Sequence, residues 1–129
     1  MENNGKFLFD TDILIDHLKN VDTATAFIQK VLSAKNKPFI SVISRIELLS
    51  GTKLDDREEE IIKNLLKLFN VILLDEFLAD LSATFRRKYL CGIADSIIAA
   101  SAYKEGAVLV SRNAKHFKNI HEIKLITPY

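Results

Sequence analysis

Short apolar runs alternate along the chain with longer segments in which apolar residues recur at the helical spacing of three and four positions. The short runs are continuously apolar, which is typical of parallel strands that are buried on both faces. The predicted strands cover residues 7–9, 39–40, 71–74, 107–110 and 124–126. The predicted helices cover residues 23–34, 41–49, 55–69, 75–90, 94–104 and 114–117, with one more helical segment from Ile13 to Leu18. This alternation predicts an α/β fold, with a mostly parallel five-stranded sheet flanked by helices on both faces.

The helix predicted over residues 55–69 carries the strongest amphipathic pattern. Its apolar stripe consists of Ile61, Ile62, Leu65, Leu66 and Phe69. Packing in the core is the default interpretation of this stripe, and an interface is the alternative. The strand predicted at 71–74 is expected to be buried.

Composition limits the class of protein. The 129 residues allow one domain, spanning residues 1–129, and 48% hydrophobic residues exclude intrinsic disorder. The single cysteine, Cys91, excludes an intrachain disulfide and fits a reducing cytoplasm. No apolar run approaches the roughly 18 residues that span a membrane, and the polar segment 1–6 does not resemble a secretory signal. With a net charge of +1, any attraction to nucleic acid has to be local.

Three acidic residues lie in the regions that follow predicted strands or open a helix, where sites form in parallel sheets. Asp10 follows the first strand, and Glu47 stands among apolar neighbours in the helix after the second. Asp95 lies in a nearly apolar helix, where an ionised carboxylate is costly unless it is paired or bound to metal. Clustered carboxylates repel one another unless a cation lies among them, so the three acids predict a site for Mg²⁺ or Mn²⁺.

Each acid also has a structural interpretation. Asp10 is suited to cap the helix that follows it, and the helix dipole favours Asp95 in a first turn. Glu47 matches a capping box with Ser44, but Ser41 is at least as good a cap. A helix that begins at Ser41 leaves Glu47 in its interior, where no box forms.

The other polar residues have simpler interpretations. Asp16 is expected to be a solvated helix residue. The histidines are scattered along the chain, so His17, His116 and His121 are each predicted to be surface or packing residues.

Four segments resemble, in order, the motifs of PIN-domain ribonucleases, and most closely those of the VapC-type toxins of bacterial and archaeal toxin–antitoxin pairs. These segments are residues 9–16, 41–51, 92–100 and 110–117. The resemblance covers essentially the whole chain. It implies a PIN-like fold and a Mg²⁺- or Mn²⁺-dependent endoribonuclease.

The resemblance also implies roles for individual residues. Asp10, Glu47 and Asp95 fall on three acidic positions that are expected to hold the metal and to act in catalysis. Asn113 falls on a catalytic position where many relatives have a fourth acidic residue, so this chain carries one negative charge fewer there. Ser111 falls on a hydroxyl position that lines the site.

Two neighbours of these residues are expected to support the site or to contact substrate. Asp12 falls where relatives often have asparagine or another polar residue. Arg112, next to Ser111 and Asn113, is the best candidate for a phosphate contact. The implied partners are an RNA substrate, a cognate antitoxin that covers the site, and a second copy of the chain in a homodimer.

Other classes of protein fit parts of the pattern. Asp10-Thr11-Asp12 also resembles the opening motif of haloacid-dehalogenase-type phosphatases, with Ser41 at a second strand end. Asp75 after the third strand superficially fits a receiver-like binding module. The phosphatase chemistry needs an acidic pair at a later strand end, which residues 111–113 do not supply, and it has no use for Asp95 in a helix. The receiver-like alternative leaves Glu47 and Asp95 without a role. A non-catalytic PIN-like protein is a further alternative, because Asn113 is not acidic.

Overall fold

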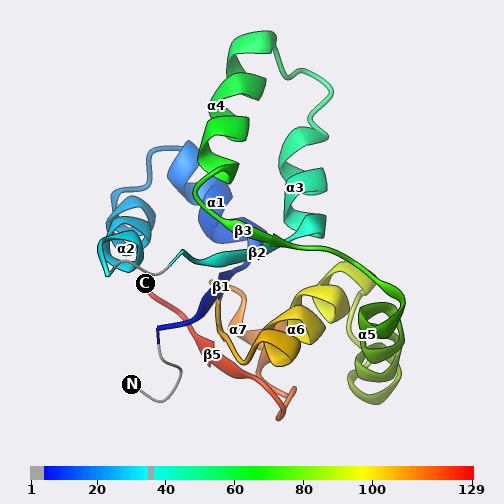
Figure 1. Ribbon diagram of the computed structural model, residues 1–129. Helices are drawn as coiled ribbons and strands as arrows, with labels where there is room; N and C mark the ends of the chain where they lie inside the picture. Colours follow the sequence, from blue (N-terminus) through cyan, green and yellow to red (C-terminus); the bar gives the residue numbers. More distant parts are fainter. Residues whose placement is uncertain (1–4, 35–36) are drawn as a thin grey trace.

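The computed structural model describes residues 5–34 and 37–129, and it shows a parallel sheet between two layers of helices (Figure 1). Part of the polar segment 1–6, residues 1–4, lies outside the described residues. The strands are β1 (Phe7–Phe9), β2 (Phe39–Ser41), β3 (Asn70–Ile72), β4 (Val108–Val110) and β5 (Lys124–Ile126). The helices are α1 (Thr11–Leu18), α2 (Asp22–Ser33), α3 (Val42–Leu49), α4 (Asp56–Leu66), α5 (Glu76–Tyr89), α6 (Ile93–Glu105) and α7 (Ala114–Phe117). The predicted α/β fold and five-stranded sheet are confirmed.

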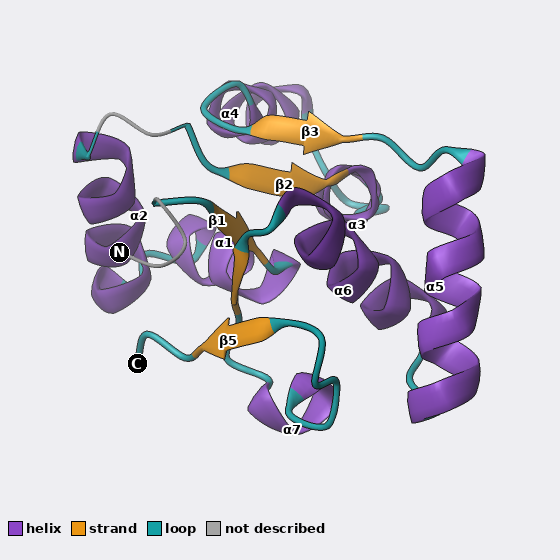
Figure 2. Ribbon diagram, turned by 60° about the horizontal axis from the view of Figure 1, so that its bottom comes forward, coloured by secondary structure: helices purple, strands orange, loops and turns teal. Residues whose placement is uncertain are grey.

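All strand pairs in the sheet are parallel, and the order is β3-β2-β1-β4-β5. The chain runs outward from β1 through β2 to β3, then crosses back to β4 and β5 on the other side, as Figure 2 shows. The connections after β1 and β4 therefore diverge, and such a switch point opens a crevice at the carboxyl ends of the strands. In the register of β1 and β4, Phe9 lies beside Val110, which places Asp10 and Ser111 next to each other.

The core has two parts, one on each face of the sheet. Phe9 belongs to the cluster formed with α1–α4, and Leu8 belongs to the cluster formed with α5, α6 and α7. Successive strand residues point to opposite faces, so β1 to β4 contribute to both clusters, whereas the edge strand β5 contributes only Leu125, to the second. The side chains of Leu8 and Phe9 are both fully buried, which contributes about 1.5–3 kcal/mol for each residue of this kind.

Helix α6 lies against the sheet with its middle completely enclosed. Ala99, Ala100, Ser101 and Ala102 are fully buried, and the Ser101 hydroxyl donates a hydrogen bond of 2.7 Å to the carbonyl of Ile97. Small side chains allow this close approach, and the backbone bond satisfies the one buried hydroxyl in the segment. No helix in the described ranges combines the length and the apolar character that crossing a bilayer requires.

Two expectations about buried residues are wrong. Strand β3 ends at Ile72, and Leu73 and Leu74 are exposed because the chain leaves the edge of the sheet there to reach α5. Within the predicted stripe of α4, Ile61 is 48% exposed, whereas Ile62, Leu65, Leu66 and Phe69 are buried. The core therefore uses a narrower face of this helix than the pattern suggested.

Candidate active site

Asp10 is a buried carboxylate at the junction of β1 and α1. It caps the helix, because Oδ1 accepts a bond of 2.8 Å from the backbone N–H of Thr11. Oδ2 accepts a bond of 2.7 Å from the hydroxyl of Ser111, at the end of the neighbouring strand β4. The capping interpretation is correct, and it leaves Asp10 facing the predicted site.

Asp12 lies one residue into α1 and is held by the segment that follows β4. Its Oδ2 accepts bonds from the backbone N–H of Arg112 at 3.0 Å and from Asn113 Nδ2 at 3.2 Å, and the Ser111 hydroxyl lies 3.4 Å away. Its Oδ1 is buried and has no hydrogen-bond partner among the described residues. Leaving a buried polar atom unpaired typically costs about 1–3 kcal/mol.

Glu47 reaches the site from α3. Ser41 caps this helix by accepting a bond of 3.1 Å from the N–H of Ile43, so Glu47 lies inside the helix and the capping box with Ser44 does not form. The hydroxyl of Thr11 donates to Glu47 Oε1 and also lies 2.7 Å from the hydroxyl of Ser44. Thr11 thereby connects the helix after β1 with the helix after β2.

Asp95 occupies the first turn of α6, after the cap residue Gly92. Its Oδ2 lies 3.2 Å from Nδ1 of His116 in α7, and the Asp95 side chain is 28% exposed. The dipole of α6 and the imidazole both favour the charged carboxylate in this half-buried position.

Of the predicted residues, the acids and Asn113 line one pocket of about 240 Å³, whereas Ser111 and Arg112 lie behind them and do not line it. Its lining includes Asp10, Thr11, Asp12, Glu47, Asp95, Asn113 and His116. Within residues 5–34 and 37–129, no three acidic, histidine or cysteine side chains form a group that could hold a metal ion as they stand. Bonds from Thr11 to Glu47 and from His116 to Asp95 hold these carboxylates in their present positions.

The electrostatics of the pocket favour a cation. Burial, and then the charge of Asp12, raise the pKa of Asp10 to about 7. Burial also raises the pKa of Asp12 and that of Asp95. Oxygen ligands of this kind suit Mg²⁺ or Mn²⁺, and the unpaired Asp12 Oδ1 is a further oxygen that can bind a metal ion. The residues of the pocket therefore fit a divalent cation.

Asp16 differs from its predicted role, and Arg112, the candidate for a phosphate contact, has a partner within the protein. The guanidinium of Arg112 pairs with Asp16, with Nη2 at 3.3 Å from Oδ1 and Nε in contact with Oδ2. Asp16 is buried, not solvated, because Arg112 and the hydroxyl of Tyr129 cover it. This ion pair anchors the segment whose backbone binds Asp12.

Sequence reasoning missed two polar residues of the pocket, Thr11 and His116. His116 was expected to be a surface or packing residue, but it contacts Asp95, because α7 folds back against α6. Its sequence signal was its place three residues after Asn113, one helical turn away on the same side. Thr11 carried a weaker signal, as a hydroxyl between two acids.

The residues on which the phosphatase-like and receiver-like alternatives depend, Ser41 and Asp75, have structural roles. Ser41 is fully buried and its hydroxyl is used as a helix cap. Asp75 caps α5 through the N–H of Leu78 and lies 3.7 Å from Lys104. Both residues therefore have structural roles outside the pocket.

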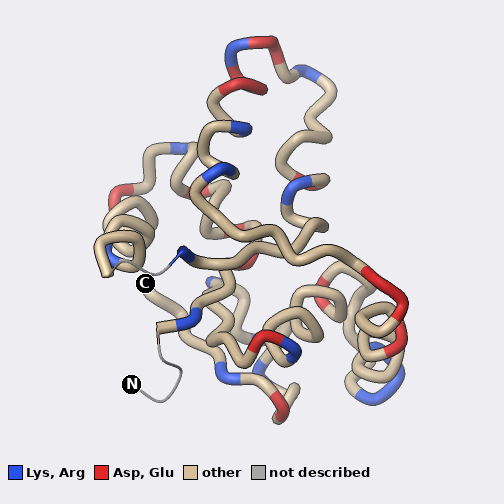
Figure 3. Tube along the Cα trace, in the orientation of Figure 1, with Lys and Arg blue, Asp and Glu red and all other residues tan. Residues whose placement is uncertain are grey.

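Charges of both signs are spread over the trace, without one continuous basic face (Figure 3). This agrees with the net charge of +1 and with an attraction to polyanions that is local.

Comparison with known proteins gives the class of this fold and site. The PIN domain family model matches residues 7–123. The chain is 32% identical over 123 residues to Ribonuclease VapC10 of Mycobacterium tuberculosis, with 91% of this chain and 90% of that protein covered. It is 28% identical over 126 residues to Ribonuclease VapC1 of Methanocaldococcus jannaschii, with 94% of this chain and 85% of the relative covered.

Solved structures agree with this class. A toxin–antitoxin complex from Klebsiella pneumoniae contains a chain with a TM-score of 0.79 and 32% identity, covering 95% of this chain and 97% of that one. VapBC2 from Rickettsia felis, bound to a DNA fragment from its promoter, shares the fold with a TM-score of 0.79 at 24% identity, over 94% and 97% of the two chains. The chain belongs to the PIN-domain family, and within it to the VapC proteins. The predicted PIN-like fold is confirmed.

Proposed function

We propose that this protein is a divalent-metal-dependent endoribonuclease that hydrolyses RNA phosphodiester bonds. The observation that carries the proposal is the pocket into which β1–α1, α3 and α6 bring Asp10, Glu47 and Asp95. The relatives named ribonucleases support RNA as the substrate. The raised pKa of Asp10 and of Asp95 supports a centre that requires a cation to stabilise its charges.

In this proposal Asp10, Glu47 and Asp95 hold Mg²⁺ or Mn²⁺. When bound, the cation neutralises the phosphate and activates water for in-line attack. The buried position of Asp10 limits competition from bulk water for its carboxylate. Glu47 is the most exposed of the three acids, and the hydroxyl of Thr11 binds its Oε1.

The surrounding residues orient these carboxylates. The Ser111 hydroxyl donates to Asp10 and receives the backbone N–H of Asn113 at 2.9 Å, so it fixes one oxygen of Asp10. Asn113 acts through hydrogen bonds, since its amide carries no charge. His116 positions Asp95 by donating from Nδ1.

The partners extend the proposal beyond the single chain. The similarity to a chain of a toxin–antitoxin complex supports neutralisation by a cognate antitoxin. We also propose that the protein forms a homodimer and acts in the cytoplasm. Size-exclusion chromatography with light scattering measures the first, and a particle of monomer mass would contradict it.

The decisive experiment is cleavage of a mixed RNA pool with and without EDTA, followed by return of Mg²⁺ or Mn²⁺. We expect cleavage that EDTA abolishes and either cation restores, and none by Asp10→Asn, which retains the capping bond to Thr11. Absence of cleavage by the folded wild type would favour a non-catalytic PIN-like protein. Hydrolysis of a small phosphomonoester without cleavage of RNA would favour a phosphatase.

A further inference from the structure

One carboxylate oxygen of Asp12 differs from the other buried side-chain polar atoms of the described residues in its hydrogen bonding. In the part of the chain that the structure describes, Asp12 Oδ1 is the one buried side-chain oxygen or nitrogen without a hydrogen-bond partner. Neither the three predicted ligands nor their supporting bonds make use of it. A carboxylate oxygen accepts bonds and donates none when it is ionised, so only a donor or a cation completes it.

The other oxygen of the same carboxylate is fully engaged. Oδ2 accepts from the backbone N–H of Arg112 at 3.0 Å and from Asn113 Nδ2 at 3.2 Å, and the Ser111 hydroxyl, which donates to Asp10, lies 3.4 Å away. These donors come from the segment after β4, which the ion pair between Arg112 and Asp16 anchors. The carboxyl group is therefore fixed on one side and unsatisfied on the other, as a metal ligand held by supporting hydrogen bonds is.

The cationic side chains nearest to Asp12 are paired with other acids, although the charge of Arg112 still acts on Asp12. Asp12 lines the same pocket as Asp10, Glu47 and Asp95. The guanidinium of Arg112 is occupied by Asp16, and the imidazole of His116 by Asp95. The pocket thus concentrates negative charge around an oxygen that no described protein cation contacts.

We infer that Asp12 is itself a ligand of the divalent cation, through Oδ1, and that the hydrogen-bonded pair Asp12–Asn113 supplies one negative charge to the centre. The inference rests on the proposed function. Because Asn113 Nδ2 bonds directly to Asp12 Oδ2, the charge belongs to the pair as a unit. An exchange of the two side-chain types, with an amide at 12 and a carboxylate at 113, preserves both the charge and the hydrogen bond.

The test measures binding of Mn²⁺ by calorimetry and by the EPR signal of the free ion. We expect Asp12→Asn to weaken binding by about 10-fold or more, since even loss of a supporting residue of a metal site costs about 10–100-fold. The double variant Asp12→Asn with Asn113→Asp is expected to return to within about threefold of the wild type. Asp80→Asn, which removes an exposed acid of α5, is the control for net charge and is expected to bind as the wild type does.

Two outcomes overturn the inference. Binding by Asp12→Asn within twofold of the wild type excludes Oδ1 as a ligand. A loss that Asn113→Asp does not recover excludes the shared charge of the pair. Thermal unfolding in EDTA verifies that the variants fold. If Asp12→Asn does not fold, the single variant Asn113→Asp decides, because a second carboxylate in the pair is expected to tighten Mn²⁺ binding. Unchanged Mn²⁺ binding by Asn113→Asp would then refute the inference.

Failure here is distinct from failure of the proposed function. A folded wild type that neither binds Mn²⁺ nor cleaves RNA contradicts the proposed function. A wild type that does both, beside an Asp12→Asn variant with unchanged Mn²⁺ affinity, contradicts only the role of Asp12.

Discussion

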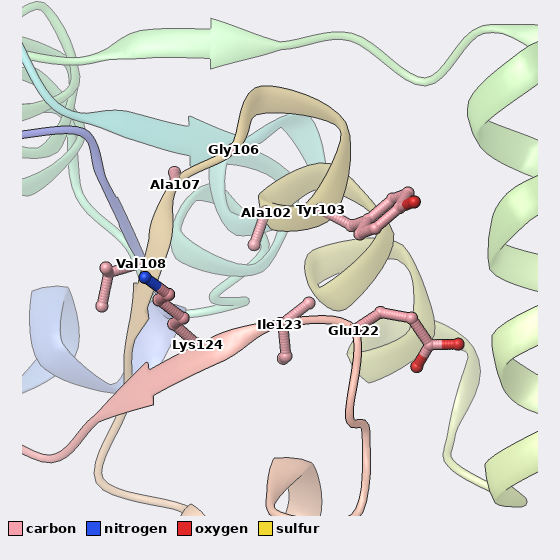
Figure 4. A pocket seen from close by; sticks show the side chains of 8 residues that line it. All are labelled: Ala102, Tyr103, Gly106, Ala107, Val108, Glu122, Ile123 and Lys124. Atoms are coloured by element: carbon pink, nitrogen blue, oxygen red, sulfur yellow. The ribbon is translucent and has the colours of Figure 1, made fainter. Parts of the chain in front are cut away.

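The pKa values of acidic side chains shift in opposite directions at the two ends of the sheet. At the carboxyl end, burial raises the pKa of Asp10, Asp12 and Asp95. At the amino end, Glu122 lies beside a hollow lined by Tyr103 and the starts of β4 and β5 (Figure 4). Hydrogen bonds from Tyr89 and Lys88 lower the pKa of Glu122.

This contrast distinguishes acids whose partners lie within the protein from acids that a bound cation would stabilise. Glu122 has a complete set of partners from its own chain, a cation and a phenol hydroxyl, and joins α5 to the segment before β5. The carboxyl-end acids have hydroxyl, amide and imidazole partners but share no protein cation that balances their combined charge. A cluster of this kind costs stability in the free protein, and a bound cation recovers it.

The largest expected difference between the two ends is in catalysis. Asp95→Asn is expected to reduce Mg²⁺-dependent RNA cleavage by more than about 100-fold, because loss of a metal ligand exceeds the usual effect of losing a supporting residue. Glu122→Gln removes the same charge at the amino end and is expected to leave cleavage unchanged. Initial rates on a fluorescent RNA measure both. Comparable losses in the two variants would show that net charge, not the pocket, governs activity.

The second difference is in the pH dependence of stability without metal. Asp10 binds its proton more tightly in the folded protein than in the unfolded chain, because its pKa is about 7 against the ordinary value of 3.8. Its contribution to stability is therefore present below about pH 4 and is lost as the pH rises through 7. Asp10→Asn removes this loss and is expected to be more stable than the wild type at pH 8 in EDTA, by on the order of 2–4 kcal/mol. Urea unfolding at pH 4 and pH 8 measures the difference. An equal free energy of unfolding for both proteins at pH 8 would contradict the buried charge.

A third comparison concerns two histidines. His116→Ala removes the donor to Asp95 and is expected to weaken Mn²⁺ binding by about 10-fold, with partial recovery in His116→Gln. His121→Ala, at the amino end beside the ring of Tyr89, serves as the control. Calorimetry distinguishes a positioning role from a purely structural one, since a structural loss would lower the melting temperature without changing Mn²⁺ affinity.

The smallest effect belongs to the amino-end pair. Tyr89→Phe removes an exposed hydrogen bond to Glu122 and is expected to lower the melting temperature by less than about 3 °C, because exposed polar pairs contribute little. RNA cleavage should remain at the wild-type level. A large fall in melting temperature would mean that the hydrogen bond between Tyr89 and Glu122 stabilises the attachment of the segment before β5 to α5 more than its exposure indicates.

The fold and the acidic positions were predictable because their signals are local. Asp10 directly follows an apolar run, and the choice of Ser41 over Ser44 as a cap correctly placed Glu47 inside α3. Strand and helix segments agreed with the hydrophobic pattern, except that α4 ends at Leu66 rather than at residue 69 and that the edge strand β3 stops short of Leu73.

Contacts between distant segments were not predictable in this way. The burial of Asp16 depends on Arg112 and Tyr129, which lie about a hundred residues further along the chain. The proximity of His116 to Asp95 depends on the packing of α7 against α6. Such contacts follow from how the helices dock, and no spacing within either segment encodes them.

The close docking of α6 makes Asp95 sensitive to changes far from the pocket. Ala99 and Ala100 are fully buried against the sheet, so a larger residue at either position is expected to push α6 away from the strands. The first turn of α6 would move with the rest of the helix. A larger side chain about one helical turn from Asp95 is thus expected to displace this carboxylate while every residue of the pocket stays the same.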